Sequence, residues 1–486
     1  MNESIYDKYE AVIGLEVHIQ LLTGSKAYSS DPAVYGGMPN THISPITLGH
    51  PGTLPKVNKK VIEYAVKLGI ACHSSIRRDN HYARKNYFYP DLPKGYQITQ
   101  DTTPICNGGY ILINNKKDKK EKQISLTRIH MEEDAGKSIH DQDPFFTLID
   151  LNRAGVPLLE MVSEPVIKTA DEAYQYLTEV RKLVRYLEIC DGNMEEGSLR
   201  CDANISVMPR GSLQMGKKVE VKNMNSIRNV QRAISYEIKR QVDEIEAGKT
   251  VVQETRSFDA ATGSTFSMRS KEMANDYRYF PEPDIPPVIV TEKYVEEVRA
   301  MMPPLPRDLH RKFTDEFHLS EYDAGVLTDT KEIALFFEEV AAHTHNYKAA
   351  ANWVMGPVKS YLNENALEVK DLNISPASVS MLIKMMDDGI VSHSAAVQKI
   401  FPALLKNPGK SPEQIAGEEN LLQDSNTASL IDYAQKAISM YPEKVAEYKA
   451  GKSGLTGLFM GEVMKLSKGK ADPKLASRIV KELLDK

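Results

Sequence analysis

The chain has 486 residues, of which 41% are hydrophobic and 26% are charged, and this length predicts two or three domains of an ordinary globular protein. Its net charge of −5 excludes a bulk polycation but leaves room for local basic patches. No apolar run approaches the ~18 residues of a membrane span and no signal-peptide pattern follows the N-terminus, so we expect a cytoplasmic protein that does not cross a membrane.

The first predicted element is a strand over residues 12–21. Every second residue from Ile13 to Leu21 is apolar, and Glu16 and His18 occupy intervening positions. Because side chains alternate between the two faces of a strand, Glu16 and His18 should share its polar face. A lone histidine is most often a hydrogen-bonded structural residue, but the i, i+2 relation to Glu16 favours a metal ligand for His18.

Residues 84–100 combine positive charge with aromatic rings. This composition suits phosphate contact together with stacking on nucleobases, and aromatic side chains buried in a hairpin explain it equally well. The residues concerned are Arg84, Lys85, Lys94, Tyr87, Phe88, Tyr89 and Tyr96.

Four further segments, 124–134, 147–152, 199–207 and 218–222, also alternate as strands. Strict alternation places Glu132 and Glu133 on opposite faces, so a bulge or the strand end must decide which one joins the other polar residues; we prefer Glu133. The remaining polar positions are His130, Asp150, Asn152, Arg200, Asp202, Asn204, Glu220 and Lys222.

These carboxylates predict a bound cation if they converge. Two like charges ~4 Å apart cost about 4 kcal/mol at an effective dielectric constant near 20. Any one of these acids alone is best explained as a solvated strand residue, but their recurrence on several polar faces reverses that preference. Oxygen ligands with a single imidazole suit Mg²⁺ or Mn²⁺ better than zinc.

Helical spacing over residues 170–187 and 227–245 predicts two amphipathic helices on the apolar side of an α+β domain, leaving the polar face open for ligand. Beyond Pro303, Pro304 and Pro306 the pattern becomes helical. A turn-rich stretch, 407–420, then precedes a last helical unit. Its basic residues either bind phosphates or are ordinary solvated lysines: Lys449, Lys452, Lys465, Lys468, Lys470, Lys474, Arg478 and Lys481.

Several common motifs are absent. The nearest match to a P-loop, residues 446–453, has Ala446 where the first glycine is needed and follows no predicted strand. The sequence has no HExxH, no GxSxG and no GxGxxG that opens a helix after a strand, which weakens hydrolase and dehydrogenase interpretations. The four cysteines form no CxxC pair, so neither a zinc knuckle nor a disulfide framework is indicated.

Longer segments of the sequence identify a protein family more specifically than these short motifs do. From about Tyr9 to the C-terminus the chain resembles the GatB family, the B subunits of aspartyl/glutamyl-tRNA amidotransferases. The strings that carry the resemblance are VIGLEVHIQL, ARKNYFYPDLPKGYQITQ, IHMEEDAGK, IDLNRAGVPLLEMVSEP, EEGSLRCDANIS, EVKNMNS, DYRYFPEPD and GEVMKLSKGKADP.

The resemblance implies a glutamine-synthetase-like antiparallel-sheet catalytic domain (residues 1–293), a helical domain (294–406) and a small helical, tRNA-binding tail domain (407–486). It also implies a heterotrimer in which an amidase partner, the A subunit, supplies ammonia and a small C subunit completes the assembly. The activity would be ATP-dependent amidation of Glu-tRNA(Gln) or Asp-tRNA(Asn) through an acyl phosphate, because a carboxylate must be activated before ammonia can displace its oxygen. Residues 84–100 would then contact the unpaired tRNA end.

By match to the family pattern, each candidate residue has an expected role. The expected Mg²⁺ or Mn²⁺ ligands are Glu16, His18, Glu133 and Glu160. Asp202, Asn204 and Glu220 would bind a second metal or orient the nucleotide, with Arg200, Asp202 and Lys222 at ATP. The candidates to hold phosphate or the substrate carboxylate are Arg153, Arg200, Lys222 and Arg278.

Two other classes of function remain open. One is a ligase or guanidino-type kinase that acts on a free amino acid, for which the helical and basic C-terminal region has no evident use. The other is a non-catalytic tRNA-binding scaffold in which the acidic face holds a structural ion.

Overall fold

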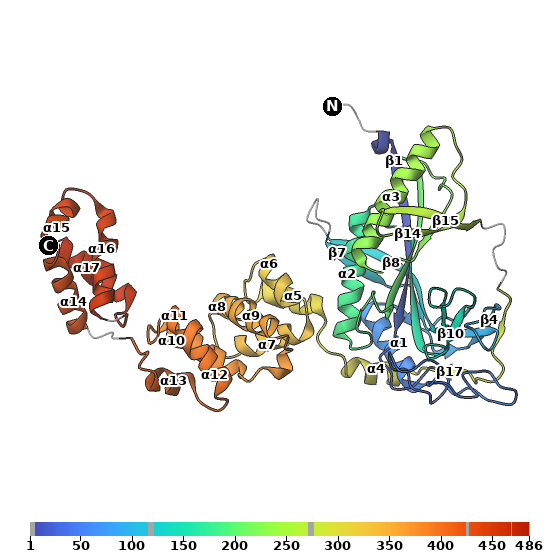
Figure 1. Ribbon diagram of the computed structural model, residues 1–486, viewed down its shortest axis with the longest axis horizontal. Helices are drawn as coiled ribbons and strands as arrows, with labels where there is room; N and C mark the ends of the chain where they lie inside the picture. Colours follow the sequence, from blue (N-terminus) through green and yellow to red (C-terminus); the bar gives the residue numbers. More distant parts are fainter. Residues whose placement is uncertain (1–4, 115–120, 271–276, 424–426, 468, 486) are drawn as a thin grey trace. The chain divides into compact units, whose positions relative to one another are not determined.

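The computed structural model describes residues 5–114, 121–270, 277–423, 427–467 and 469–485 (Figure 1). The chain divides into two compact units, Met1–Leu305 and Pro306–Lys486. The first unit ends at Leu305 rather than at the expected residue 293, because helix α4 (Glu292–Ala300) buries Val298 in the core of the first unit, to which helix α1 (Lys59–Ala71) also contributes. The proline run therefore follows the last helix of the first unit.

A ten-stranded sheet forms the frame of the first unit, with strand order β15-β14-β13-β12-β1-β11-β8-β6-β2 and β7 beside β8. The pairings are antiparallel, as expected, except that β13 and β14 are parallel, so the sheet is mixed. Parallel neighbours need a long crossover, and helix α3 (Ile227–Glu246) supplies it between these two strands. The strands are β1 (Tyr9–Gln20), β2 (Ser75–Ile76), β6 (Cys106–Asn107), β7 (Tyr110–Asn114), β8 (Glu121–Glu133), β11 (Pro157–Ser163), β12 (Leu199–Pro209), β13 (Val219–Lys222), β14 (Glu254–Asp259) and β15 (Ser264–Ser270).

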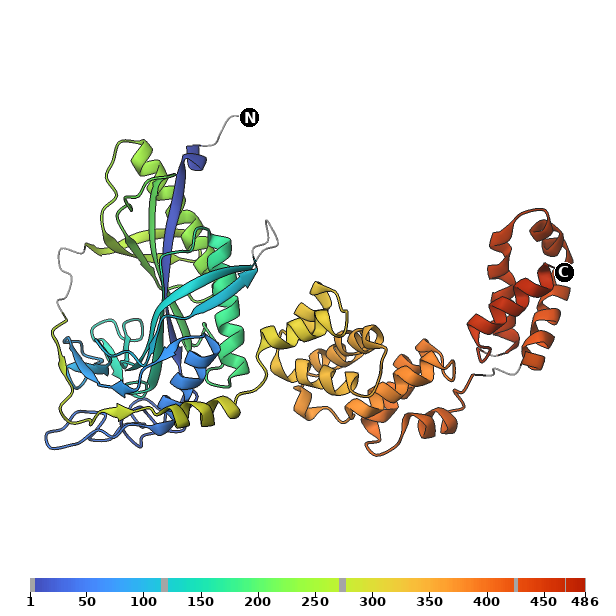
Figure 2. The ribbon, with the colours of Figure 1, turned by 180° about the vertical axis from the view of Figure 1, so that it is seen from behind.

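Helices α2 (Ala170–Tyr186) and α3 (Ile227–Glu246) cover the apolar face of this sheet, as predicted (Figure 2). Each begins at a capping residue, because Thr169 accepts a hydrogen bond from the backbone of Glu172 and Ser226 does so from Asn229. Their buried side chains join the alternate apolar residues of β1 in one core. Burial of each large side chain contributes about 2 kcal/mol, which fixes the apolar face inward and turns the polar face away from the helices.

Smaller sheets flank the large one. A three-stranded sheet is formed by β16 (Tyr279–Pro281), β4 (Ala83–Asn86) and β5 (Tyr96–Thr99), and β5 packs near β8. Two-stranded pairs are β9 (Lys137–Ile139) with β10 (Leu148–Asp150), and β3 (Asp79–Asn80) with β17 (Val288–Ile289). These additions form part of the surroundings of the polar face.

The second unit is helical, as predicted. Helices α14 to α17 share a hydrophobic core that includes Leu430, Phe459 and Val480, and Lys468 lies outside the described residues. Among the described residues, no helix combines the length and apolar character needed to cross a bilayer. The helices are α5 (Pro306–Asp315), α6 (Glu321–Leu327), α7 (Lys331–Ala341), α8 (Tyr347–Trp353), α9 (Lys359–Glu364), α10 (Pro376–Asp387), α11 (His393–Ala395), α12 (Phe401–Lys406), α13 (Pro412–Glu418), α14 (Thr427–Ser439), α15 (Pro442–Lys449), α16 (Thr456–Leu466) and α17 (Pro473–Leu484).

Candidate functional site

Strand register aligns polar residues in rows across the face that the helices leave uncovered. His18 on β1 lies opposite Glu160 on β11 and Arg200 on β12, and Glu160 lies opposite His130 on β8. The apolar alternates Val17 and Ile19 are fully buried on the other face. Residues distant in the sequence therefore meet because four strands pair in register.

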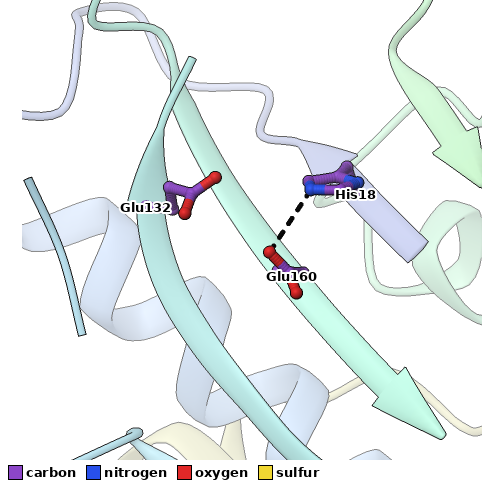
Figure 3. A group of neighbouring side chains, drawn as sticks. All are labelled: His18, Glu132 and Glu160. Carbon is purple, nitrogen blue, oxygen red and sulfur yellow. Dashed lines mark ion pairs between the residues drawn. The ribbon is translucent and has the colours of Figure 1, made fainter. Parts of the chain in front are cut away.

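The first cluster, here called the His18 group, consists of His18, Glu132 and Glu160. One ligand atom of each residue lies within 4.8 Å of the others. Figure 3 shows the three side chains directed toward one another from β1, β8 and β11, with His18 Nε2 at 3.3 Å from Glu160 Oε2. Both carboxylates are buried, so they face one another with little water to screen their charge.

Burial and charge oppose each other in the His18 group. Burial favours the neutral form of Glu160, but the hydrogen bond from His18 and the nearby charges of His130, His18 and Lys85 outweigh it and lower the pKa of this carboxyl. Burial also favours neutral His18, yet Glu160 and the surrounding acids raise its pKa. The cluster thus holds an ionised carboxylate beside an imidazole whose protonated form it stabilises.

The second cluster, the Glu16 group, consists of Glu16, Asp202 and Glu220, whose ligand atoms also lie within 4.8 Å of one another. Burial, followed by the charge of Glu160, raises the pKa of Glu16, even though Asn204 Nδ2 donates a hydrogen bond to it at 2.7 Å. Lys222 donates to Asp202 and lies 3.3 Å from Glu220. One lysine for three carboxylates leaves an excess of negative charge.

The donor sets fit Mg²⁺ or Mn²⁺. Each cluster offers carboxylate oxygens, and the His18 group adds one imidazole nitrogen, a combination that suits hard divalent cations. No cysteine is available as a softer ligand, because all four thiols are free and buried and none belongs to either cluster. The structure brings His18 together with Glu160, and it places Glu16 in the other cluster with Asp202, Asn204, Glu220 and Lys222.

Two predicted arginines meet at Asp134, at the end of β8. Arg200 donates to Asp134 Oδ2 at 2.9 Å, and Arg153 Nε lies 3.6 Å from the same oxygen. Arg153 also donates to the carbonyl oxygens of Ala135 and Gly136 at 3.0 and 2.7 Å. Both guanidinium groups are therefore held in fixed positions, and Arg200 occupies the same strand row as His18.

Arg278 lies apart from these residues. Alternation along the segment that leads into β16 assigns Tyr277 and Tyr279 to the side of Lys85, which pairs with Tyr279 across the strands. Arg278 takes the opposite side, is exposed, and uses its carbonyl to accept a hydrogen bond from Asn86. Among the described residues, the structure does not bring its guanidinium to either cluster.

Glu133 is the prediction that the structure corrects. Its carboxylate accepts hydrogen bonds from Lys94 and, at 2.8 Å, from the backbone of Ile98, and it lines a separate cavity of about 200 Å³ with Lys26 and His50. The register between β8 and β11 is regular at both Glu132 and Glu133, and it shifts only between Val162 and Ser163. Since no bulge intervenes, alternation turns Glu132 toward His18 and Glu133 away.

Sequence reasoning named His130 among the polar strand positions without giving it a role, and it missed Lys85 and Thr99 as neighbours of the His18 group. Lys85 Nζ lies 3.9 Å from Glu132 Oε2, Thr99 Oγ1 donates to that oxygen at 3.1 Å, and His130 Nε2 lies 3.5 Å from Glu160. No local signal identifies Lys85 or Thr99, because their position depends on how β4 and β5 pack beside β8.

The chain is similar to known proteins over almost its whole length. Residues 11–296 match the model of the GatB/GatE catalytic domain, and residues 335–484 match that of the GatB domain. The chain is 48% identical to the aspartyl/glutamyl-tRNA(Asn/Gln) amidotransferase B subunit of Thermoanaerobacter pseudethanolicus, over 99% of this chain and 100% of the relative.

Two further B subunits of the same name are similar over nearly their whole length. That of Clostridium tetani is 45% identical over 98% of this chain and 99% of its own, and that of Thermosynechococcus vestitus is 47% identical over 98% and 97%. Both carboxylate clusters lie within the span of the catalytic-domain match. The chain belongs to the family of aspartyl/glutamyl-tRNA(Asn/Gln) amidotransferase B subunits.

Proposed function

We propose that this protein catalyses the ATP-dependent amidation of Glu-tRNA(Gln), Asp-tRNA(Asn) or both, in the cytoplasm. The observation that carries the proposal is the meeting of two carboxylate clusters on one open face of the sheet, within the catalytic-domain match. A sheet with helices on one face and an acidic, cation-flanked opposite face also supports a glutamine-synthetase-like fold for this unit.

The reaction has two steps. The side-chain carboxylate of the esterified Glu or Asp attacks the terminal phosphorus of ATP, which forms an acyl phosphate and releases ADP. Ammonia then attacks the activated carbonyl carbon, and inorganic phosphate leaves with the electrons of the broken carbon–oxygen bond. The ester to tRNA stays intact throughout, so the product is Gln-tRNA(Gln) or Asn-tRNA(Asn).

His18, Glu132 and Glu160 would hold Mg²⁺ or Mn²⁺, with Glu16, Asp202, Asn204 and Glu220 at a second ion or at the nucleotide. When bound, the ion would supply positive charge to the phosphates of ATP. The raised pKa of Glu16 supports this assignment, because it reflects burial and like-charge crowding that a cation would relieve.

The flanking cations would position the substrates. Arg200 and Lys222 are held by Asp134 and Asp202 and would bind nucleotide phosphate, with Arg153 beside them. Lys85 Nζ lies at the long distance of 3.9 Å from Glu132 and over the ring of Tyr277, and its charge would be available to the carboxylate that reacts. Arg278 is exposed and would reach the substrate only from the outer side of the β16 segment.

Ammonia would come from an amidase partner, the A subunit, in a heterotrimer with a small C subunit. The tail helices α14 to α17 would add contacts to the tRNA. The relatives are named as the B subunit of an amidotransferase for tRNA(Asn/Gln), and that name supports an assembly of this kind.

The test is reconstitution with the partner subunits. Glu132→Gln and His18→Ala should reduce ATP-dependent amidation by at least about a hundredfold, while the glutaminase activity of the partner persists. Glu10→Gln is the matched control. Glu10 lies on β1, as His18 does, but at the far end of that strand, where it contacts Lys168 at 3.8 Å. Full amidation by both site variants would refute the proposal, and turnover of free glutamate without tRNA would favour a small-molecule ligase.

A further inference from the structure

A row of tyrosines begins directly beside the His18 group. Lys85 Nζ lies 3.9 Å from Glu132 Oε2 and 5.2 Å from the ring centroid of Tyr277. The ring of Tyr277 lies 5.8 Å from that of Tyr87, at an interplanar angle of 73°. Tyr87 in turn lies 6.0 Å from Tyr89 at 64°. The rings form a continuous path outward from the carboxylates.

Strand alternation separates this row from the structural part of the same segment. Arg84 takes the other side of β4, where it donates to Glu282 at 2.7 Å and stacks over Tyr96 at 4.3 Å. Those contacts stabilise the hairpin and need no ligand. Lys85, by contrast, pairs with Tyr279 across the strands and faces the His18 group.

The row is not a hydrophobic core. In the row, Tyr89 is 50% exposed, while Tyr87 and Tyr277 are half-buried. Tyr279, which pairs with Lys85 beside the row, is 42% exposed. In an edge-to-face pair, one ring keeps both faces clear of its partner, so a flat ligand can stack on it. Aromatic rings and a cation beside an acidic site provide what an unpaired nucleobase and its phosphate or carboxylate need.

We propose that Tyr87 and Tyr277 stack on the unpaired adenine at the 3′ end of the aminoacyl-tRNA, and that Lys85 then contacts the esterified carboxylate. This inference rests on the proposed function, and it names the residues that bring the RNA end to the site. ATP carries the same base, but a single adenine would leave the outer part of the row unused. A single-stranded end, with further bases behind the first, matches a path that continues to Tyr89.

The experiment uses two fluorescent probes with the full chain in its assembled complex. One probe is an RNA hairpin whose unpaired 3′ end carries 2-aminopurine, a base that loses fluorescence when it stacks. The other is 2-aminopurine riboside triphosphate with Mg²⁺. Tyr87→Leu and Tyr277→Leu are compared with Tyr87→Phe, which keeps the ring, and with Phe88→Ala, which removes a neighbouring ring that is 91% exposed.

We expect binding of the RNA probe to quench its fluorescence with the wild type, Tyr87→Phe and Phe88→Ala. Tyr87→Leu and Tyr277→Leu should lose the quenching and weaken RNA binding about tenfold, with equal melting temperatures and an unchanged response to the nucleotide probe. Persistent RNA quenching in both leucine variants would overturn the stacking site. Loss of the nucleotide signal instead would overturn the choice of RNA as occupant.

Neither probe measurement depends on turnover, so this test is separate from that of the proposed function. Lack of amidation by the wild-type complex would refute the function. Amidation by a wild-type complex whose Tyr87→Leu and Tyr277→Leu variants still quench the RNA probe would refute the stacking site alone.

Discussion

Glu132 and Glu133 are consecutive residues of β8, yet consecutive residues of β5 bind them on different sides of the strand. Thr99 Oγ1 donates to Glu132 at 3.1 Å beside the His18 group, and the backbone N–H of Ile98 donates to Glu133 at 2.8 Å beside Lys94. Glu132 thereby belongs to the His18 group, with Lys85 at 3.9 Å, while Glu133 forms a close ion pair with Lys94.

The two residues should therefore differ in their effect on stability. Glu133→Leu leaves Lys94 without its partner in a site where the lysine side chain is only 11% exposed, and it should lower the free energy of unfolding by about 3 kcal/mol. Glu132→Gln should change it far less in metal-free buffer, because Glu132 shares its surroundings with the like charge of Glu160. Urea unfolding measures both, and equal losses would contradict the distinction.

Lys26 should make stability depend on pH. Its side chain is fully buried, with Nζ donating to the carbonyl of His42, and burial lowers the pKa of Lys26 to about 8. Between pH 8 and the ordinary value near 10.5, the unfolded chain binds the proton and the folded chain does not. Stability should therefore rise with pH across this window, by on the order of 1 kcal/mol per pH unit.

Lys26→Met isolates this contribution, because the other titrating groups remain. Urea unfolding at several pH values between 8 and 10.5 should show a smaller rise in stability for the variant than for the wild type. Parallel curves would mean that Lys26 keeps its proton in the folded protein.

His130 should act as a positioning residue. Its Nε2 lies 3.5 Å from Glu160 Oε2, the same oxygen that His18 contacts, and Arg128 Nε donates to its Nδ1 at 3.4 Å. With Nδ1 accepting, the ring proton lies on Nε2 and holds the carboxylate. His130→Ala should weaken Mg²⁺ binding about tenfold or more, and His130→Gln, which keeps a donor, should restore much of it. Calorimetric titration with Mg²⁺ tests this, and an unchanged affinity in both variants would rule the role out.

The tail helices should contribute electrostatic contacts to tRNA. Lys474, Arg478 and Lys481 share one face of α17, with spacings of four and three residues, and all three are exposed. Replacing all three with Gln should weaken tRNA binding and reduce the slope of log K against log salt by about 0.9 for each phosphate that the variant no longer neutralises. ATP binding should stay the same. An unchanged slope would assign these residues to an ordinary solvated face.

Deleting residues 427–486 is the companion experiment, because α14 to α17 have a hydrophobic core of their own and their loss leaves the first unit intact. A larger loss of tRNA affinity than in the triple variant would locate further contacts in the tail. Equal affinity of the truncated and full chains would remove the tail from tRNA binding.

Alternation within a strand predicted much of the site. It assigned Glu16 and His18 to one face and Asp202 and Asn204 to another polar face, and register in β1 and β12 joined the two. The choice of Glu133 over Glu132 failed because it allowed a bulge where the strand is regular.

Other features depend on contacts that no local pattern records. Lys85 reaches the His18 group only because β4 and β5 pack beside β8, and α4 belongs to the first unit only because Val298 joins its core. The parallel pairing of β13 with β14 follows from a helix that crosses over the sheet, whereas hydrophobic periodicity describes each strand by itself.

The central claim is that His18 and Glu132, not Glu133, bind a divalent ion together with Glu160. Electron paramagnetic resonance of bound Mn²⁺, with pulsed detection of a coupled nitrogen, measures this directly. We predict a nitrogen coupling that His18→Asn removes, loss of Mn²⁺ binding in Glu132→Gln, and retained binding in Glu133→Gln. Mn²⁺ that stays bound in Glu132→Gln but is lost in Glu133→Gln, or a wild-type spectrum without nitrogen coupling, would contradict the claim.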